Sequence, residues 1–268
     1  VLRAACVQPV EHYRLDVGLL RPGDPADMIV VDSLERLRVT RTVIDGNLVA
    51  ADGETLIPDL RSESPNRFSR SRVAASDFSI EARSETARVI EALDGQLVTN
   101  CIELDVTTQH GRAVSDPSRD VLKLAVVNRY AEAPPAVAFI RNIGLKRGAI
   151  ASSVAHDSHN IIVVGVTDVE MAAAANEIIA YRGGLSLADG SSTNVIPLPI
   201  AGLMSDADGY EVAAAYTEMD AKAKEMGSPL RAPYMTLSFM ALLVIPALKL
   251  SDRGLFDGLR FEFVDIFV

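Results

Sequence analysis

The sequence predicts an α+β fold in which a small strand-rich part is followed by a mixed α/β domain. Short segments rich in Val, Ile, Leu and Thr, bounded by Gly, Pro, Asn and Asp, occur on both sides of residue 80 and are typical of strands. Longer segments with helix-capping residues at their ends follow after residue 167. The chain has 268 residues, 49% of them hydrophobic, which is enough for one or two domains with buried cores.

The N-terminal part begins within a predicted helix. Residues 1–7 favour a helix but no N-cap residue precedes them, so we expect residue 1 to be a cut point inside a longer chain. Strands are predicted at 26–32, 38–44 and 48–51, and Asp45-Gly46 favours a hairpin turn between the last two. A sheet this small cannot bury its own faces well, so we expect it to pair with strands that the sequence does not contain.

A polar segment separates this part from the larger domain. Residues 61–79 are basic and aperiodic, which indicates a linker or an extended surface segment whose arginines are solvated. Beyond the linker, alternating apolar segments predict six strands, at 87–93, 97–106, 121–128, 136–142, 148–155 and 160–166.

Three helices are predicted in the remaining sequence. The first takes Asp168 as its N-cap and stops before Gly183-Gly184, and the second covers residues 210–226 and ends at Gly227. The third is a buried helix over the apolar residues 235–248, with Pro246 near its end.

Composition excludes several classes of partner. The chain carries 36 acidic and 26 basic residues, and its net charge of −10 disfavours nucleic acid and anionic membrane. No apolar segment approaches the ~20 residues that a membrane-spanning helix needs. Cys6 and Cys101 are the only cysteines and lie in separate regions, which fits a reducing cytoplasm.

The densest polar cluster lies between two predicted apolar strands, and its candidate functional residues are His156, Asp157, His159 and Asn160. Imidazoles near a carboxylate, in a connection between strands, can transfer protons in a cleft. The alternative is a tight turn whose Asp, Ser and Asn side chains bond to nearby backbone groups. Metal binding by this segment alone is disfavoured, because a catalytic zinc site usually takes three converging protein ligands. The apolar residues 197–205 favour buried packing over the wall of a pocket.

Two sets of motifs resemble a known family. "GLLRPGDPADMIVVD" (18–32) and "RVTRTVIDGNLVA" (38–50) resemble the strands that close the small β-sandwich of the amidohydrolase superfamily. "RNIGLKRGAIASSVAHDSHNIIVVG" (141–165), "PLPIAGLMS" (197–205) and "APYMTLSFMALLVIPALKL" (232–250) resemble the C-terminal domain of adenine deaminases. The resemblance implies the end of a barrel helix plus a partial β-sandwich over residues 1–60, the linker over 61–79 and the adenine deaminase C-terminal α+β domain over 80–268.

The resemblance also implies a reaction. In that family a metal-bound hydroxide attacks C6 of adenine, giving hypoxanthine and ammonia in purine salvage. The divalent metal (manganese, iron or zinc) belongs to an upstream (β/α)8 barrel, so we expect no metal in this chain and no activity from it alone. The implied partners are adenine, the upstream barrel and a homo-oligomer. Within this sequence the resemblance leaves four residues that could contribute to the substrate cleft: His156, Asp157, His159 and Asn160.

Two other functions stay open at this point. The chain could be a non-catalytic module that stabilises the barrel or joins subunits. It could also be a small metal hydrolase in its own right, with the histidine-containing turn as its site. Deamination by this chain beside that of the full-length enzyme separates the hydrolase from the partial enzyme, and a subunit-mass measurement tests the joining of subunits.

Overall fold

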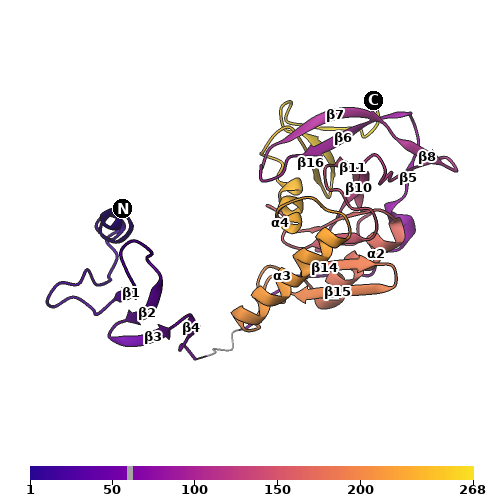
Figure 1. Ribbon diagram of the computed structural model, residues 1–268. Helices are drawn as coiled ribbons and strands as arrows, with labels where there is room; N and C mark the ends of the chain where they lie inside the picture. Colours follow the sequence, from indigo (N-terminus) through magenta and orange to yellow (C-terminus); the bar gives the residue numbers. More distant parts are fainter. Residues whose placement is uncertain (59–62) are drawn as a thin grey trace. The chain divides into compact units, whose positions relative to one another are not determined.

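The chain forms two compact units in the computed structural model, which describes residues 1–58 and 63–268 (Figure 1). Unit 1 is Val1–Arg61 and unit 2 is Ser62–Val268. Helices and strands are mixed along the chain, so the predicted α+β class is confirmed. The predicted end of the first part, residue 60, and the first two residues of the predicted linker, 61 and 62, lie outside the described residues. No helix in the described ranges combines the length and the apolar character needed to cross a bilayer.

Unit 1 contains a short helical segment and one antiparallel sheet of strand order β1-β2-β3-β4. The elements are the π-helix η1 (Arg3–Val7), α1 (Gln8–Tyr13), β1 (Met28–Val31), β2 (Val39–Ile44), β3 (Asn47–Ala51) and β4 (Glu54–Thr55). Asp45 (φ 45°) and Gly46 (φ 76°) form the predicted turn between β2 and β3. Two successive residues with positive φ are what a two-residue hairpin turn requires, which is why Asp-Gly occurs there.

The sheet of unit 1 leaves its apolar side chains uncovered. None of the described residues 1–58 is buried. Ile29 of β1 is 57% exposed and Ile44 of β2 is 52% exposed. The expectation that this sheet cannot bury its own faces is therefore confirmed, because a sheet of this size needs a second layer to exclude water.

Unit 2 is built on an eight-stranded sheet of order β15-β14-β12-β13-β10-β11-β6-β7, in which only β6 and β11 are parallel neighbours. The strands are β6 (Thr86–Ala92), β7 (Thr99–Asp105), β10 (Val121–Val127), β11 (Ala136–Arg141), β12 (Ala149–Ser152), β13 (Ile161–Gly165), β14 (Gly184–Asp189) and β15 (Ser192–Pro197). The first six match the predicted strands, with ends that differ by up to three residues. β14 and β15 were not predicted.

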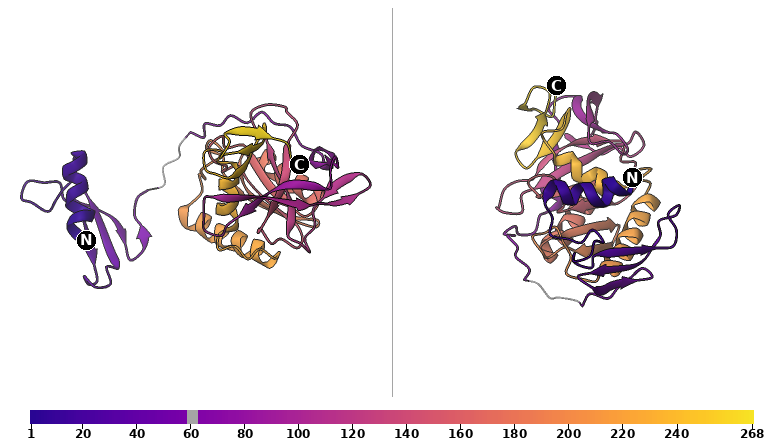
Figure 2. Two further views of the ribbon diagram at one scale, coloured as in Figure 1. Left: turned by 90° about the horizontal axis from the view of Figure 1, so that it is seen from above. Right: turned by 90° about the vertical axis from the view of Figure 1, so that its left-hand side faces the viewer.

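Helices cover both faces of this sheet (Figures 1 and 2). The alternation of side chains along β10 decides which residues meet which helix. Leu122 and Leu124 point to the face that packs against α3 (Gly209–Glu225) and α4 (Pro233–Ser238). Ala125 and Val127 point to the opposite face, which packs against α2 (Asp168–Tyr181). The fully buried β10 is therefore the centre of two cores.

Three-stranded sheets flank the large one. One consists of β16 (Leu248–Ser251), β17 (Gly254–Asp257) and β18 (Glu262–Val264), and the other of β5 (Ile80–Glu81), β9 (Arg112–Val114) and β8 (Thr107–Gln109). The 3-10 turns are η2 (Ala75–Phe78) and η3 (Phe239–Ala241). Residues 63–79, within the segment predicted as a linker, contact the rest of unit 2. The Val73 backbone N–H donates to Asn176 Oδ1, Asn176 Nδ2 donates to the Val73 carbonyl, and Arg70 pairs with Glu132 at 3.1 Å.

Two helix predictions need correction. Thr167, and not Asp168, is the N-cap of α2, because its Oγ1 accepts the backbone N–H of Glu170 at 3.2 Å while Asp168 is already helical. The helix predicted over residues 235–248 is wrong. Helical structure ends with η3 at Ala241, and β16 begins at Leu248, since Pro246 cannot continue a helical ladder and Leu248 to Ser251 pair with β17. The second predicted helix is confirmed within one residue at each end.

Candidate functional site

The histidine turn, which we define as residues Ala155–Asn160, connects β12 and β13 in the middle of the large sheet. The backbone N–H of His159 donates to Ala155 O at 2.7 Å, which closes the turn. The backbone N–H of His156 donates to Ser238 O at 3.0 Å, which ties the turn to the end of α4. Asp157 is exposed and both imidazoles are half-buried, so the turn presents its polar groups at the surface of unit 2.

The two imidazoles lie against each other. Their ring centroids are 5.5 Å apart with planes at 70°, and the His156 ring stacks on Phe239 of η3 at 4.7 Å. His159 has a φ of 51°, a left-handed conformation that few residues other than glycine adopt. Unusual backbone conformations of this kind are found often at functional sites, because neighbouring contacts must hold them in place.

The surroundings of His159 favour its neutral form. Burial lowers its pKa from the ordinary 6.5, and the neighbouring His156 and Arg129 lower the pKa further, while the Asp157 carboxylate raises it. Its Nδ1 is buried and has no hydrogen-bond partner among the described residues. A neutral imidazole has one nitrogen that can accept a proton, which is what a general base needs.

Asn160 differs from the other three candidates because it is only 2% exposed. Its Oδ1 accepts the backbone N–H of Arg129 at 3.2 Å, and its Nδ2 donates to Ser158 Oγ at 3.2 Å. The bond to Arg129 holds the end of the turn against the segment that follows β10. Of the four predicted residues, His156, Asp157 and His159 therefore reach the surface of unit 2, whereas the Asn160 side chain points inward.

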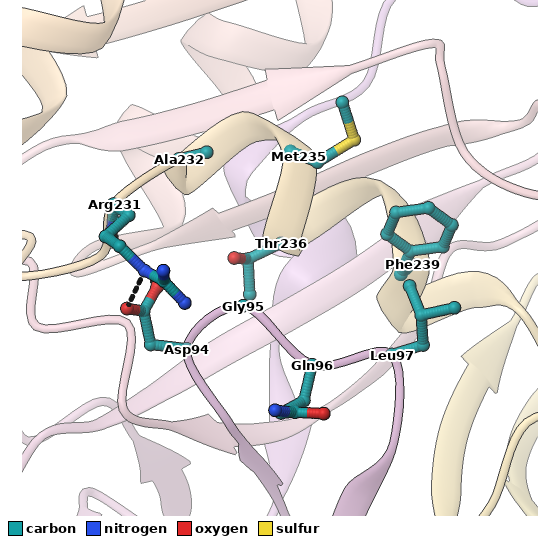
Figure 3. A pocket seen from close by; sticks show the side chains of 9 residues that line it. All are labelled: Asp94, Gly95, Gln96, Leu97, Arg231, Ala232, Met235, Thr236 and Phe239. Atoms are coloured by element: carbon teal, nitrogen blue, oxygen red, sulfur yellow. Dashed lines mark hydrogen bonds and ion pairs between the residues drawn. The ribbon is translucent and has the colours of Figure 1, made fainter. Parts of the chain in front are cut away.

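One cavity borders the turn and another lies beside the phenylalanine on which His156 stacks. The first, of about 460 Å³, has Asp157 and Ser158 at its edge; its remaining walls are Ala241, Leu243, Val244, Ser251, Asp252, Arg253, Phe256, Phe261 and Phe263. The second, of about 350 Å³, is lined by Phe239, the residue on which His156 stacks. Figure 3 shows Arg231 and Asp94 paired at the rim of that second cavity, 2.8 Å apart, with Met235 and Leu97 along it. Both volumes are in the range of small-molecule sites.

Several residues of this region could not be found from the sequence. Arg129, Phe239 and Arg231 come from segments far from the histidine turn in sequence. One weak signal exists for Arg129, because Asn128-Arg129-Tyr130 follows the apolar strand β10 directly, and polar residues at strand ends often have functional roles.

The described residues do not fit a metal centre. In residues 1–58 and 63–268, no three side chains of His, Cys, Asp or Glu come together in a way that could hold a metal ion. The histidine turn brings two imidazoles and one carboxylate onto one short loop, but they do not converge.

The comparisons with known proteins define the class first. Residues 1–49 match the amidohydrolase family. Residues 96–262 match the family model of the adenine deaminase C-terminal domain, which is more than half of the chain. The chain belongs to the adenine deaminase C-terminal domain family.

Adenine deaminases are among the curated proteins that are similar to this chain. The chain is 58% identical over 270 residues to that of Salinibacter ruber, with all of this chain and 49% of the relative covered. It is 53% identical over 266 residues to that of a Sulfurovum species, covering 99% of this chain and 48% of the relative. It is 46% identical over 275 residues to that of Methanosarcina barkeri, covering 100% and 50%. The chain thus spans about half the length of the curated relatives it matches.

Proposed function

We propose that this chain is the C-terminal part of an adenine deaminase, which converts adenine and water to hypoxanthine and ammonia. The observation that carries the proposal is the histidine turn, a surface loop with a neutral imidazole beside a carboxylate, in a chain of the adenine deaminase C-terminal domain family. The similar proteins named adenine deaminase support the substrate.

His159 has the chemistry that this hydrolysis needs. The water oxygen bonds to C6 of adenine and one water proton goes to N1 of the ring. The second water proton then passes to the exocyclic nitrogen, the bond from C6 to that nitrogen breaks, and ammonia leaves as C6 becomes a carbonyl. A neutral imidazole accepts a proton from the attacking water and returns one to the leaving nitrogen. We propose His159 for this transfer, with His156 and Asp157 as its neighbours at the cleft and Asn160 as the residue that fixes the end of the turn.

The remaining parts of the enzyme come from outside this chain in our proposal. A divalent metal, manganese, iron or zinc, is bound by an upstream barrel, because the described residues supply no cluster of metal ligands. The exposed apolar side chains of unit 1 support pairing of its sheet with upstream strands. The two free cysteines, Cys6 and Cys101, are consistent with a cytoplasmic protein. A homo-oligomer is part of the same proposal.

Co-expression of the two halves of the enzyme tests the proposal. The upstream half, this chain, and both together are each assayed for hypoxanthine formed from adenine. We expect activity only when both halves are present. Activity of this chain alone would instead support an independent hydrolase, and full activity of the upstream half alone would refute a contribution from this chain.

The uncovered sheet of unit 1 also favours a second candidate, a non-catalytic module that stabilises the barrel. This module would restore activity in the co-expression assay even with its histidine turn altered. Co-expression of the upstream half with a His159→Ala chain distinguishes the two functions. A catalytic role of His159 predicts that deamination is lost, whereas a stabilising module predicts that deamination is kept.

A further inference from the structure

Arg129 is a buried cation whose backbone is hydrogen-bonded to the histidine turn. It is 4% exposed, and its guanidinium lies over the rings of Tyr130, at 4.7 Å, and Phe68, at 5.9 Å. Its Nη2 donates to the Tyr130 hydroxyl at 2.8 Å, but Nε and Nη1 have no hydrogen-bond acceptor among the described residues. No ion pair joins it to a carboxylate of those residues either. An unpaired buried charge is unfavourable for stability, so stability alone does not explain an arginine here.

Arg129 and its neighbour hold the chain on both sides of His159. The Tyr130 hydroxyl, which accepts from the guanidinium, donates to the backbone carbonyl of Ser158 at 3.0 Å. The backbone N–H of Arg129 donates to Asn160 Oδ1 at 3.2 Å. Ser158 and Asn160 are the residues before and after His159. The left-handed conformation of His159 is therefore fixed from the end of β10.

The guanidinium of Arg129 also packs closely against the backbone of Gly202. Gly202 lies against it, and a Cβ built at Gly202 would overlap Nη1 of Arg129. Gly202 has a φ of 71°, and its carbonyl accepts a hydrogen bond from Ser153 Oγ at 2.6 Å. Only glycine allows this close approach without strain. The segment 197–205 therefore confines the charge of Arg129 to one position beside the turn.

We propose that Arg129 is a positioning residue for deamination, whose fixed charge and hydrogen bonds keep His159 oriented and unprotonated so that it can accept a proton. The inference rests on the proposed role of His159. A fixed positive charge disfavours a second positive charge nearby, so it favours the neutral imidazole. The other charged or titratable groups that act on His159 are His156 and Asp157 of the turn itself, and the lowered pKa of His159 agrees with this arrangement.

The test combines a titration with a rate profile. The pKa of His159 is measured by NMR in this chain, and kcat/KM is measured against pH in the full-length enzyme. Arg129→Gln, which removes the charge, should raise the pKa of His159 towards 6.5. The acid limb of the kcat/KM profile should move to higher pH by the same amount. Arg129→Lys, which keeps the charge, should restore most of the wild-type pKa.

Arg70→Gln is the matched control. Arg70 is also a buried arginine, with a side chain 7% exposed, but it pairs with Glu132 and donates to Ala133 O at 2.8 Å. Its loss should leave the pKa of His159 unchanged. Tyr130→Phe serves if Arg129→Gln does not fold, because it keeps the charge of Arg129 and removes the hydroxyl that joins the guanidinium to the Ser158 carbonyl, and Tyr130 is 41% exposed. It should lower kcat about tenfold or more with little change in KM.

The outcomes separate this inference from the proposed function. A pKa of His159 that is equal in wild type and Arg129→Gln, or a Tyr130→Phe enzyme with normal kcat, overturns the role of Arg129. A His159→Ala enzyme with normal kcat overturns the proposed function instead, whatever the titration gives.

Discussion

Lys249 is predicted to lower the stability of the folded chain at neutral pH. Its side chain is fully buried in β16, and its Nζ donates to Leu97 O at 2.6 Å. Burial lowers the pKa of this lysine from 10.5 to about 8. A shift from 10.5 to about 8 is equivalent to ~3 kcal/mol between the protonation states, so the protonated form at pH 7 lowers the free energy of unfolding by about that amount.

The direction of the pH dependence follows from this shift. Between about 8 and 10.5 the unfolded chain binds the Lys249 proton and the folded chain has released it, so stability rises with pH in that window. Integration from pH 8 to 9.5 gives a rise of about 1.5 kcal/mol. The measurement stops at pH 9.5 because the pKa values of Tyr216 and Tyr234 are raised above 10 in the folded chain. At higher pH these tyrosines ionise first in the unfolded chain, which lowers the free energy of unfolding.

Lys249→Met removes the charge and keeps an apolar side chain of similar length. The gain of up to ~3 kcal/mol at pH 7 is offset by about 1–3 kcal/mol for the Leu97 carbonyl left without a donor. Stability at pH 7 should therefore change little or rise, and the rise between pH 8 and 9.5 should disappear. Comparing the two proteins cancels the contribution of Cys101, whose raised pKa affects both.

Urea unfolding at half-unit steps from pH 7 to 9.5 measures the effect. Lys146→Met is the matched control, because Lys146 is exposed and its Nζ likewise donates to one carbonyl, that of Pro117, at 2.8 Å. This control should keep the wild-type slope. Equal slopes in wild type and Lys249→Met would show that burial does not lower the pKa of Lys249.

Three further predictions concern the site. Because the pKa of His159 is lowered, its contribution to stability is present above pH 6.5 and is lost as pH falls from there to the folded pKa; His159→Leu should flatten that part of a urea-unfolding profile. Gly202→Ala should reduce the free energy of unfolding by about 1–2 kcal/mol, measured by the same method, since it strains a positive φ and displaces Arg129; an unchanged value contradicts the close packing. Metal analysis after dialysis against chelator should find less than one equivalent in this chain, and one or more retained equivalents would mean that it holds a site of its own.

Six of the eight strands of the large sheet were predictable because their apolar residues lie in segments bounded by turn residues. β10 and β13 are buried on both faces, so their sequences, VLKLAVV and IIVVG, are almost continuously apolar. The segment 235–248 shows where this reasoning fails. It is as apolar as a buried helix, but its apolar side chains are distributed among α4, η3 and a loop that ends in β16. Periodicity cannot separate these arrangements in a short apolar segment.

The candidate site was predictable only where its residues are neighbours in sequence. His156, Asp157, His159 and Asn160 form one motif, and the structure places them on one turn. Arg129 and Phe239 reach that turn only through the pairing of β10 with β13 and the packing of α4 on the sheet. No local pattern encodes such contacts. The Asn160 side chain likewise points inward because its Oδ1 accepts a hydrogen bond from the backbone N–H of Arg129, which lies 31 positions away in sequence.

The most direct test of the central claim is the turnover of adenine by a full-length enzyme carrying His159→Ala. His110→Ala is the control, since His110 also lies in a turn of unit 2 with a φ of 51° but is exposed at the β8–β9 hairpin. His159→Ala should lower kcat by about 10²–10⁴ while the melting temperature is retained, and His110→Ala should change neither. A His159→Ala enzyme that stays folded and deaminates adenine at the wild-type rate would contradict the proposed proton transfer by His159.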